Sequence, residues 1–264
     1  MKVKDIAYHI EKLCPKSLAC EWDNVGLLIG NAENEVTKIL VTLDVDIFVV
    51  REAIDCGANL IVSHHPLMFN AIRRLTEQDA SQKVLMELVK NDISLYSAHT
   101  NLDVAPDGLN DFLAKKLGFA DIEILEPTGE YDGKICGFGR IFELDEPKKL
   151  IEIVNDCKDK LNLCAVRYCG DDDIKIKRIA VNSGGGTSSM NCCFEKNVDL
   201  FITGDFKYNV LRDACENNLA VIDAGHYNTE VIVKDLFFDY LSDKFGRDII
   251  IKSRKNIDIV KICE

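Results

Sequence analysis

Five side chains at three places in the chain have the types and spacing of metal ligands. The tandem His64-His65 follows an apolar run, Asp103 ends a polar stretch, and His226 precedes Glu230 by one helical turn. Neutral imidazoles combined with carboxylates suit a divalent transition metal. Five ligands are more than one catalytic metal takes while it keeps a position open, and they are too few to close two separate sites. A pair of metals that shares a bridging carboxylate fits this ligand count best.

Each group of ligands follows a segment with the pattern of a buried strand. The apolar runs at residues 59–63 and 93–97 precede the histidine pair and the aspartate, and the run at 217–224 precedes the last histidine. Pro66 indicates that the chain leaves the sheet after the pair, because proline cannot continue a central ladder. Ligands of open α/β sheets bind beyond the carboxyl ends of the strands. We therefore expect these side chains to gather in one cleft at that end.

The individual motifs have little specificity on their own. A lone histidine and glutamate one turn apart usually form a surface pair, so the prediction depends on the recurrence of ligands at equivalent places. His99 lies near the candidate ligands in sequence. It is either a hydrogen-bond partner behind them or the catalytic residue that transfers a proton.

Strand and helix patterns alternate along the chain and then repeat. Strands at 38–44, 59–63 and 93–97 enclose helices at 46–56 and 81–91, which predicts right-handed crossovers and a largely parallel sheet. Three later segments match this plan in order: 177–182 matches 38–43, 197–203 matches 57–63, and 217–224 matches 91–98. The fold class is thus α/β, with two related halves, mainly parallel or mixed sheets, and a dinuclear metal site in the cleft between them.

A boundary near Pro127 separates the expected halves, 1–126 and 127–264. Beyond this boundary we expect a strand at 135–142 and a helix at 148–161, opened by Pro147 in its first turn. The final helix and strand, within 231–264, could instead pack on the first half.

Composition excludes several classes of function. The formal net charge of -12 argues against nucleic-acid binding through backbone phosphates. No apolar run approaches the length of a membrane span, and the start of the chain lacks a signal-peptide core, so we expect a soluble cytoplasmic protein with no membrane partner. The cysteines number 11 without a Cys-x-x-Cys pair. We interpret them as reduced thiols that act as small apolar residues, because a thiolate zinc site would need the missing spacing.

A glycine-rich stretch, Gly184 to Gly186, follows the strand at 177–182. Its backbone amides could cradle a phosphate. It lacks the Gly-Lys-Ser/Thr ending of a P-loop, so a plain flexible connection is an equally good interpretation.

The motifs together resemble the signatures of one family. They are Trp22-Asp23-Asn24-Val25-Gly26-Leu27, Ser63-His64-His65-Pro66-Leu67, Ser97-Ala98-His99-Thr100-Asn101-Leu102-Asp103, Thr203-Gly204-Asp205-Phe206-Lys207-Tyr208 and Gly225-His226-Tyr227-Asn228-Thr229-Glu230. In this order, and over essentially the whole chain, they are similar to the GTP cyclohydrolase 1 type 2 homologues, the NGG-interacting-factor-like dinuclear metal proteins.

The resemblance implies a toroidal homohexamer of two-domain subunits, each with two divalent ions at a site that faces the interior. The implied ligands are the five that ligand chemistry selects, with Glu230 as the bridging carboxylate and Asp103 as the alternative. Mixed nitrogen and oxygen ligands leave the metal open among Zn, Fe, Mn, Co and Ni. The chain is too short for the domain that some relatives insert between the halves. Asn209 stands where many relatives have a histidine, which puts in doubt a role for position 209 but not the ligand set.

Two classes of function stay open. A metal-dependent hydrolase would use a metal-activated water on a nucleotide or phosphorylated small molecule. The resemblance implies attack at C8 of a purine, as in a GTP cyclohydrolase, and the ligand set fits phosphoester hydrolysis equally well. A non-catalytic metal-binding or adaptor protein would carry the same ligands, because ligation does not require turnover.

Overall fold

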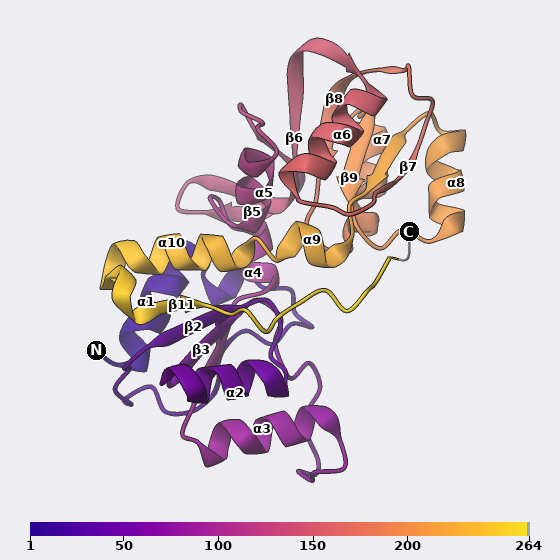
Figure 1. Cartoon of the computed structure of the whole chain (residues 1–264). Helices are drawn as coiled ribbons and strands as arrows, with labels where there is room; N and C mark the ends of the chain where they lie inside the picture. The colour runs from indigo at the N-terminus through magenta and orange to yellow at the C-terminus, as the bar shows by residue number, and fades with distance from the viewer. Residues whose placement is uncertain (263–264) are drawn as a thin grey trace. The chain divides into compact units, whose positions relative to one another are not determined.

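The computed structural model describes residues 1–262, which form two compact units (Figure 1). The first unit contains Met1–Ala105 and Val233–Ile257, and the second contains Pro106–Ile232 and the residues from Asp258. The first unit thus ends before the boundary expected near Pro127. A cut at that proline would separate α5 (Leu109–Lys116) from β6 (Lys134–Lys149) and β8 (Lys175–Val181), the strands on which it packs.

The first unit is built on a five-stranded sheet with the order β1-β4-β3-β2-β11. Its strands β2, β3, β4 and β11 run parallel, and β1 pairs antiparallel with β4 at one edge. Its elements are α1 (Val3–Leu13), a 3-10 turn at Lys16–Leu18, β1 (Gly26–Ile29), β2 (Ile39–Thr42), α2 (Ile47–Cys56), β3 (Leu60–Ser63), α3 (Ala80–Lys90), β4 (Ser94–Ser97), α4 (Thr100–Val104), α10 (Val233–Phe245), a 3-10 turn at Arg247–Ile249, and β11 (Ile250–Lys252). The last helix and strand therefore belong to the first unit.

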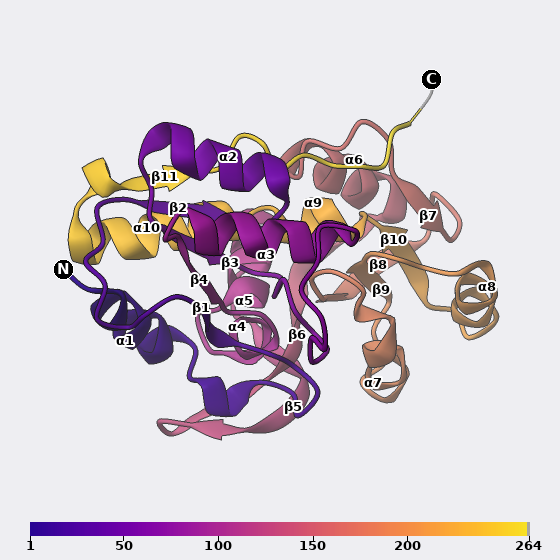
Figure 2. The same ribbon diagram turned by 90° about the horizontal axis from the view of Figure 1, so that it is seen from below.

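Helices α2 and α3 cover one face of this sheet (Figures 1 and 2). Every residue of β2, β3 and β4 is buried, as expected for parallel strands covered on both faces. The Asp46 carboxylate caps α2 by accepting hydrogen bonds from the amides of Phe48 and Val49 at 2.9 and 2.8 Å. Gly57 ends the helix in the left-handed region, at φ 72°. Local sequence signals thus set both ends of this crossover helix.

The second unit is built on a six-stranded sheet with the order β5-β6-β8-β9-β10-β7. Strands β8, β9 and β10 run parallel, and the other pairings are antiparallel. Its elements are α5, β5 (Glu123–Tyr131), β6 (Lys134–Lys149), α6 (Leu150–Lys160), β7 (Arg167–Cys169), β8 (Lys175–Val181), a 3-10 turn at Gly186–Ser189, α7 (Met190–Glu195), β9 (Leu200–Thr203), α8 (Tyr208–Glu216), β10 (Ala220–Asp223) and α9 (His226–Glu230). The apolar residues of α7 and α8 pack with Phe201 and Val221 in the core of this unit.

The predicted α/β class and the internal repeat are confirmed. In the first unit β2, β3 and β4 are successive parallel neighbours, with β1 antiparallel beside β4; in the second unit β8, β9 and β10 have the same arrangement, with β7 antiparallel beside β10. In each unit, the strand that precedes the three parallel strands in sequence, β1 or β7, thus pairs with the last of those three strands. Within residues 1–262, each helix is too short or too polar to cross a membrane.

Two local predictions are wrong. Pro147 does not open a helix: it lies inside β6, and α6 begins at Leu150. The pairing of β6 with β8 shifts register between Glu143 and Lys148, and proline is tolerated at such an irregularity because no ladder hydrogen bond is lost there. The interpretation of all cysteines as reduced thiols is also wrong, because Cys169 and Cys215 form a disulfide.

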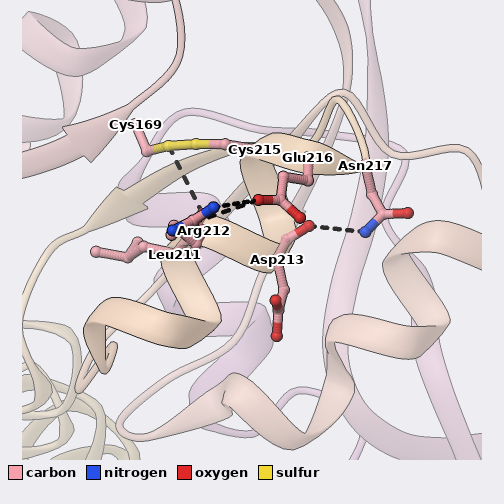
Figure 3. The surroundings of a disulfide bond; sticks show 7 residues. All are labelled: Cys169, Leu211, Arg212, Asp213, Cys215, Glu216 and Asn217. Carbon is pink, nitrogen blue, oxygen red and sulfur yellow. Dashed lines mark hydrogen bonds and ion pairs between the residues drawn. A yellow bond between two sulfur atoms is a disulfide. The ribbon is translucent and has the colours of Figure 1, made fainter.

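The disulfide joins the edge strand β7 to α8 (Figure 3). Strand β7 pairs with β10, and α8 leads directly into β10, so the sheet itself brings the two cysteines together across 46 residues of sequence. Arg212 and Glu216 form an exposed ion pair on the same helix at 2.9 Å. The disulfide thus attaches the short, exposed edge strand β7 to the neighbouring helix α8.

Reduction of the disulfide will lower the stability of the second unit. Opening a cross-link that spans 46 residues costs about 4 kcal/mol in free energy of unfolding, mainly through the unfolded chain. Urea denaturation with and without dithiothreitol measures the difference. Cys215→Ser should reproduce the loss and abolish the response to reductant, whereas the exposed Cys164→Ser should change neither.

Loss of a buried ion pair in the second unit will lower the free energy of unfolding more than loss of an exposed ion pair. Arg140 is fully buried, donates from Nε to Asp111 at 2.9 Å, and donates to the carbonyls of Gly137 and Gly139. Asp111→Ala removes this carboxylate from the buried guanidinium of Arg140, which should cost roughly 3 kcal/mol in urea denaturation. Asp156→Ala, which removes an exposed ion pair between α6 and Lys148 at the end of β6, should cost less than about 1 kcal/mol. Equal losses in the two variants would contradict this account.

Candidate metal centre

The tandem histidines lie directly beyond β3. His64 is fully buried, and its Nδ1 lies 2.8 Å from the carbonyl oxygen of Ala98, which follows β4. Because a carbonyl can only accept, Nδ1 carries the proton and Nε2 is the ligand atom. That Nε2 lies 3.5 Å from Oδ1 of Asp103, which is itself 7% exposed. The predicted ligands His64 and Asp103 are therefore brought together within the first unit.

His65 is oriented by a residue that follows β2, which lies on the other side of β3 from β4. Its Nδ1 lies 2.7 Å from Oδ1 of Asp44, two residues beyond β2. The other carboxylate oxygen of Asp44 accepts from the side-chain amide of Asn256 at 3.2 Å. Carboxylates that hold Nδ1 of a histidine fix its tautomer and make Nε2 more basic towards a metal. Sequence reasoning missed Asp44, although its place just after a buried strand was a usable signal.

His99 joins the same cluster from the start of α4. Its Nδ1 lies 3.0 Å from Oδ1 of Asp23, whose other oxygen accepts from the amide and hydroxyl of Thr100 at 3.0 and 2.5 Å. Burial opposes ionisation of Asp23, but the hydrogen bonds from His99 and Thr100 outweigh it and lower the pKa of its carboxyl to about 2. The ligand atoms of His64, His65 and His99 all lie within 4.8 Å of one another.

The second unit assembles the other two predicted ligands. His226 and Glu230 lie on α9 beyond β10, with Nε2 and Oε2 2.9 Å apart. Nδ1 of His226 lies 2.7 Å from Oδ2 of Asp205, two residues beyond β9. The hydrogen bond that His226 donates to Glu230 and the nearby carboxylate of Asp205 raise the imidazole pKa of His226 to about 9, against the opposing effect of burial. The His226–Glu230 pair thus holds a proton, and a bound metal cation would take the place of that proton.

The glycine-rich loop beyond β8 packs against this pair and is not a flexible connection. The amides of Gly184 and Gly186 donate to the hydroxyls of Thr229 and Thr203, both at 2.9 Å. These two amides are therefore already used inside the unit, which argues against the phosphate-cradle interpretation. A Cβ at Gly184 would lie 2.0 Å from Oε1 of Glu230 and 3.1 Å from Nε2 of His226. The missing side chain at Gly184 makes room for the candidate ligands.

The donor sets fit a divalent metal. Four imidazoles have Nδ1 against an oxygen acceptor, so in each of them Nε2 is the nitrogen that can coordinate a metal or accept a proton: His64, His65, His99 and His226. In the first unit, three such nitrogens and a carboxylate gather closely. Electron pairs crowded in this way repel one another unless a cation or protons lie among them. His9, on α1, instead packs edge-on against Phe245 and takes no part in this arrangement.

A cavity in the second unit lies away from this chemistry. Its volume is about 330 Å³, and its lining includes residues at the amino-terminal ends of the parallel strands, namely Lys175, Asp199 and Ala220. The predicted ligands lie beyond the carboxyl-terminal ends, where α/β sheets bind their ligands. Side-chain chemistry therefore locates the candidate centre better than cavity size does.

A methyl group at position 184 will disturb the second unit far more than one at the next residue. Gly184 has φ +61°, so alanine there is strained and also overlaps the Glu230 carboxylate. We expect Gly184→Ala to lower the free energy of unfolding by roughly 2 kcal/mol. At Gly185 the nearest atoms lie at 3.6 Å or more, so Gly185→Ala should change stability by less than about 0.5 kcal/mol. Urea denaturation of the metal-free variants provides the test. Equal free energies of unfolding in Gly184→Ala and Gly185→Ala would contradict the crowding at Gly184.

The chain is similar to known proteins over nearly its whole length. The family model of Duf34/NIF3 (NGG1p interacting factor 3) matches residues 1–257. A Clostridium acetobutylicum protein named GTP cyclohydrolase 1 type 2 homolog is 38% identical over 265 residues, covering 99% of this chain and 98% of that protein. One of the same name from Clostridium perfringens is 40% identical over 236 residues, covering 89% of each. The crystal structure of Staphylococcus aureus protein SA1388 is similar with a TM-score of 0.90 and 31% identity, over 100% of this chain and 99% of that one. The chain therefore belongs to the Duf34/NIF3 family.

Proposed function

We propose that the protein holds two divalent metal ions per subunit and uses them to hydrolyse a nucleotide or a phosphorylated small molecule. One observation carries the proposal: the candidate imidazoles share an orientation in which Nδ1 is held by an oxygen and Nε2 is the coordinating atom. Metal-binding histidines have this arrangement, because the held proton fixes the tautomer that ligation requires. A surface histidine that binds no metal does not require an oxygen acceptor at Nδ1.

The proposed ligands are His64, His65 and Asp103 from the first unit with His226 and Glu230 from the second, all serving one dinuclear centre. The two residues from the second unit are too few to hold a metal tightly by themselves, which supports shared use. Glu230 is our choice for the bridging carboxylate, because its side chain is only 5% exposed and Gly184 leaves it little room to move. Asp103 is the alternative bridge. The donor set suits Zn, Fe, Mn, Co or Ni.

When bound, two such ions would lower the pKa of a water molecule and polarise the group that it attacks. His99 is proposed as the residue that transfers a proton. Asp23 holds its Nδ1, as in other histidine–carboxylate pairs, and its Nε2 lies close to the ligand atoms of His64 and His65. The ionised Asp23 would stabilise the imidazolium that forms when His99 accepts a proton.

The relatives narrow the proposal further. Those from Clostridium are named GTP cyclohydrolase 1 type 2 homolog, which supports attack at C8 of a purine as one form of the reaction. We also propose that the protein is cytoplasmic and that it acts as a toroidal homohexamer. With a formal net charge of -12, a nucleic-acid substrate is not part of the proposal.

Removal of the proposed bridging carboxylate will abolish metal-dependent turnover. Glu230→Gln keeps the shape of the side chain but not its charge, so bound metal should fall from two ions per chain to one or fewer, and turnover should fall at least roughly a hundredfold. Elemental analysis after desalting measures the metal, and product release from a nucleotide panel measures turnover. Glu216→Gln, in an exposed pair on α8, is the matched control and should change neither quantity.

Two results would overturn parts of this proposal. Full metal occupancy in Glu230→Gln would remove Glu230 from the centre. Two bound ions without turnover on any nucleotide or phosphoester, with each candidate metal supplied in turn, would eliminate the hydrolase. The second result would favour a non-catalytic metal-binding or adaptor protein instead.

A further inference from the structure

We infer that Trp22 and Phe69 form an aromatic platform that binds the planar heteroaromatic ring of a ligand beside His99. The platform would make the substrate a base-bearing nucleotide and not a simple phosphoester. This inference deepens the proposed function, because it names the ligand class for the same site. It rests on contacts within the first unit.

The two rings of the platform are exposed where burial would be expected. Trp22 is 63% exposed and Phe69 is 49% exposed. Their centroids lie 6.4 Å apart with a tilt of 32°, and both rings meet the His99 imidazole nearly edge-on, at 6.0 and 5.7 Å. Single exposed apolar residues need no explanation, but adjoining exposed aromatics beside a candidate catalytic histidine indicate a binding surface. A flat ring can rest on their faces with its edge towards His99.

Polar side chains hold the platform in place from both sides of Trp22. The Asp23 carboxylate binds the imidazole of His99 and the amide of Thr100, and the amide of Cys20 donates to the Thr100 hydroxyl at 3.0 Å. Asn24 donates from its side chain to the carbonyl of Met68 at 2.6 Å, beside Phe69. The Trp22 loop is thus connected both to the histidine turn and to the Phe69 loop. A surface held in this way loses little conformational freedom when a ligand binds.

The chemistry of the platform selects one class of ligand. Stacking on an aromatic face favours a flat π-system such as a purine over an aliphatic or purely ionic group. The loop that carries Phe69 also carries Arg73 and Arg74, both exposed, and guanidinium groups suit phosphates. A nucleotide has both kinds of group.

Trp22 is the only tryptophan in the chain, so its fluorescence reports directly on the platform. The full-length protein, loaded with metal, is titrated with guanosine triphosphate under excitation at the red edge of tryptophan absorption. Tripolyphosphate and ribose 5-phosphate serve as probes without a base. We expect saturable quenching by the guanine nucleotide and none by the other two.

Variants at Phe69 separate stacking from ordinary apolar contact. Phe69→Tyr should keep the affinity, whereas Phe69→Leu should weaken guanine-nucleotide binding about tenfold through loss of a stacking face. Phe48, which is 57% exposed on α2, provides the control, and Phe48→Leu should bind as the unaltered protein does. Circular dichroism verifies that each variant is folded.

Several outcomes would overturn the inference. These are quenching by the base-free probes alone, no saturable quenching at millimolar nucleotide, or equal affinities in Phe69→Leu and Phe48→Leu. An emission maximum that shifts with subunit dissociation but not with nucleotide would place the aromatic pair at an interface between copies. Because the experiment measures binding, an absence of turnover would remove the proposed hydrolase and leave the aromatic platform intact. Conversely, hydrolysis of a ring-free phosphoester without quenching would retain the hydrolase and remove the platform.

Discussion

Hydrogen bonds from Nδ1 of each candidate imidazole to an oxygen acceptor are the constraint on which the rest of the centre depends. A neutral imidazole has two tautomers and rotates about two side-chain bonds, so an unsupported histidine presents no fixed lone pair. In this protein the acceptor is a carboxylate for His65, His99 and His226, and a backbone carbonyl for His64. Each acceptor sets the tautomer, the ring orientation and the basicity of the coordinating nitrogen together.

Parallel pairing of strands brings most of these acceptors into place. His65 follows β3, and its partner Asp44 follows the adjacent β2; His226 follows β10, and its partner Asp205 follows the adjacent β9. Adjacent strands lie about 4.8 Å apart, so residues just beyond their ends are within reach of a hydrogen bond. The repeated order of strands in the two units explains why the same histidine–aspartate pairing occurs twice.

Glycine is needed where this arrangement is most crowded. Gly184 occupies the turn beyond β8 with a positive φ, close to the carboxylate of Glu230. Its amide is bound by Thr229, one residue before that glutamate on α9. The turn and α9 are therefore fixed to each other, and any side chain at position 184 would have to displace the Glu230 carboxylate. Sequence alone left this glycine-rich stretch between a phosphate cradle and a flexible connection; its hydrogen bonds to Thr229 and Thr203 exclude the flexible connection and argue against the cradle.

Periodicity and ligand chemistry identified the parallel strands, the crossover helices α2 and α3, the repeated α/β plan and the ligand candidates, because these are local properties of the chain, whereas they missed β5, inside which Pro127 lies. The cap at Asp46 and the stop at Gly57 are readable for the same reason. Local patterns failed at Pro147, where only the pairing of β6 with β8 reveals an irregularity that accommodates proline.

Tertiary structure alone decided which groups support the histidines. Asp23 and His99 are separated by 76 residues in sequence, and no local pattern marks Asp23 as their partner carboxylate. The same holds for the disulfide between Cys169 and Cys215, whose approach depends on which strands flank β10. Residue types thus limit the chemistry that a chain can perform, whereas strand order determines which of those residues come within hydrogen-bonding distance, because contacts between distant segments exist only after the sheets have formed.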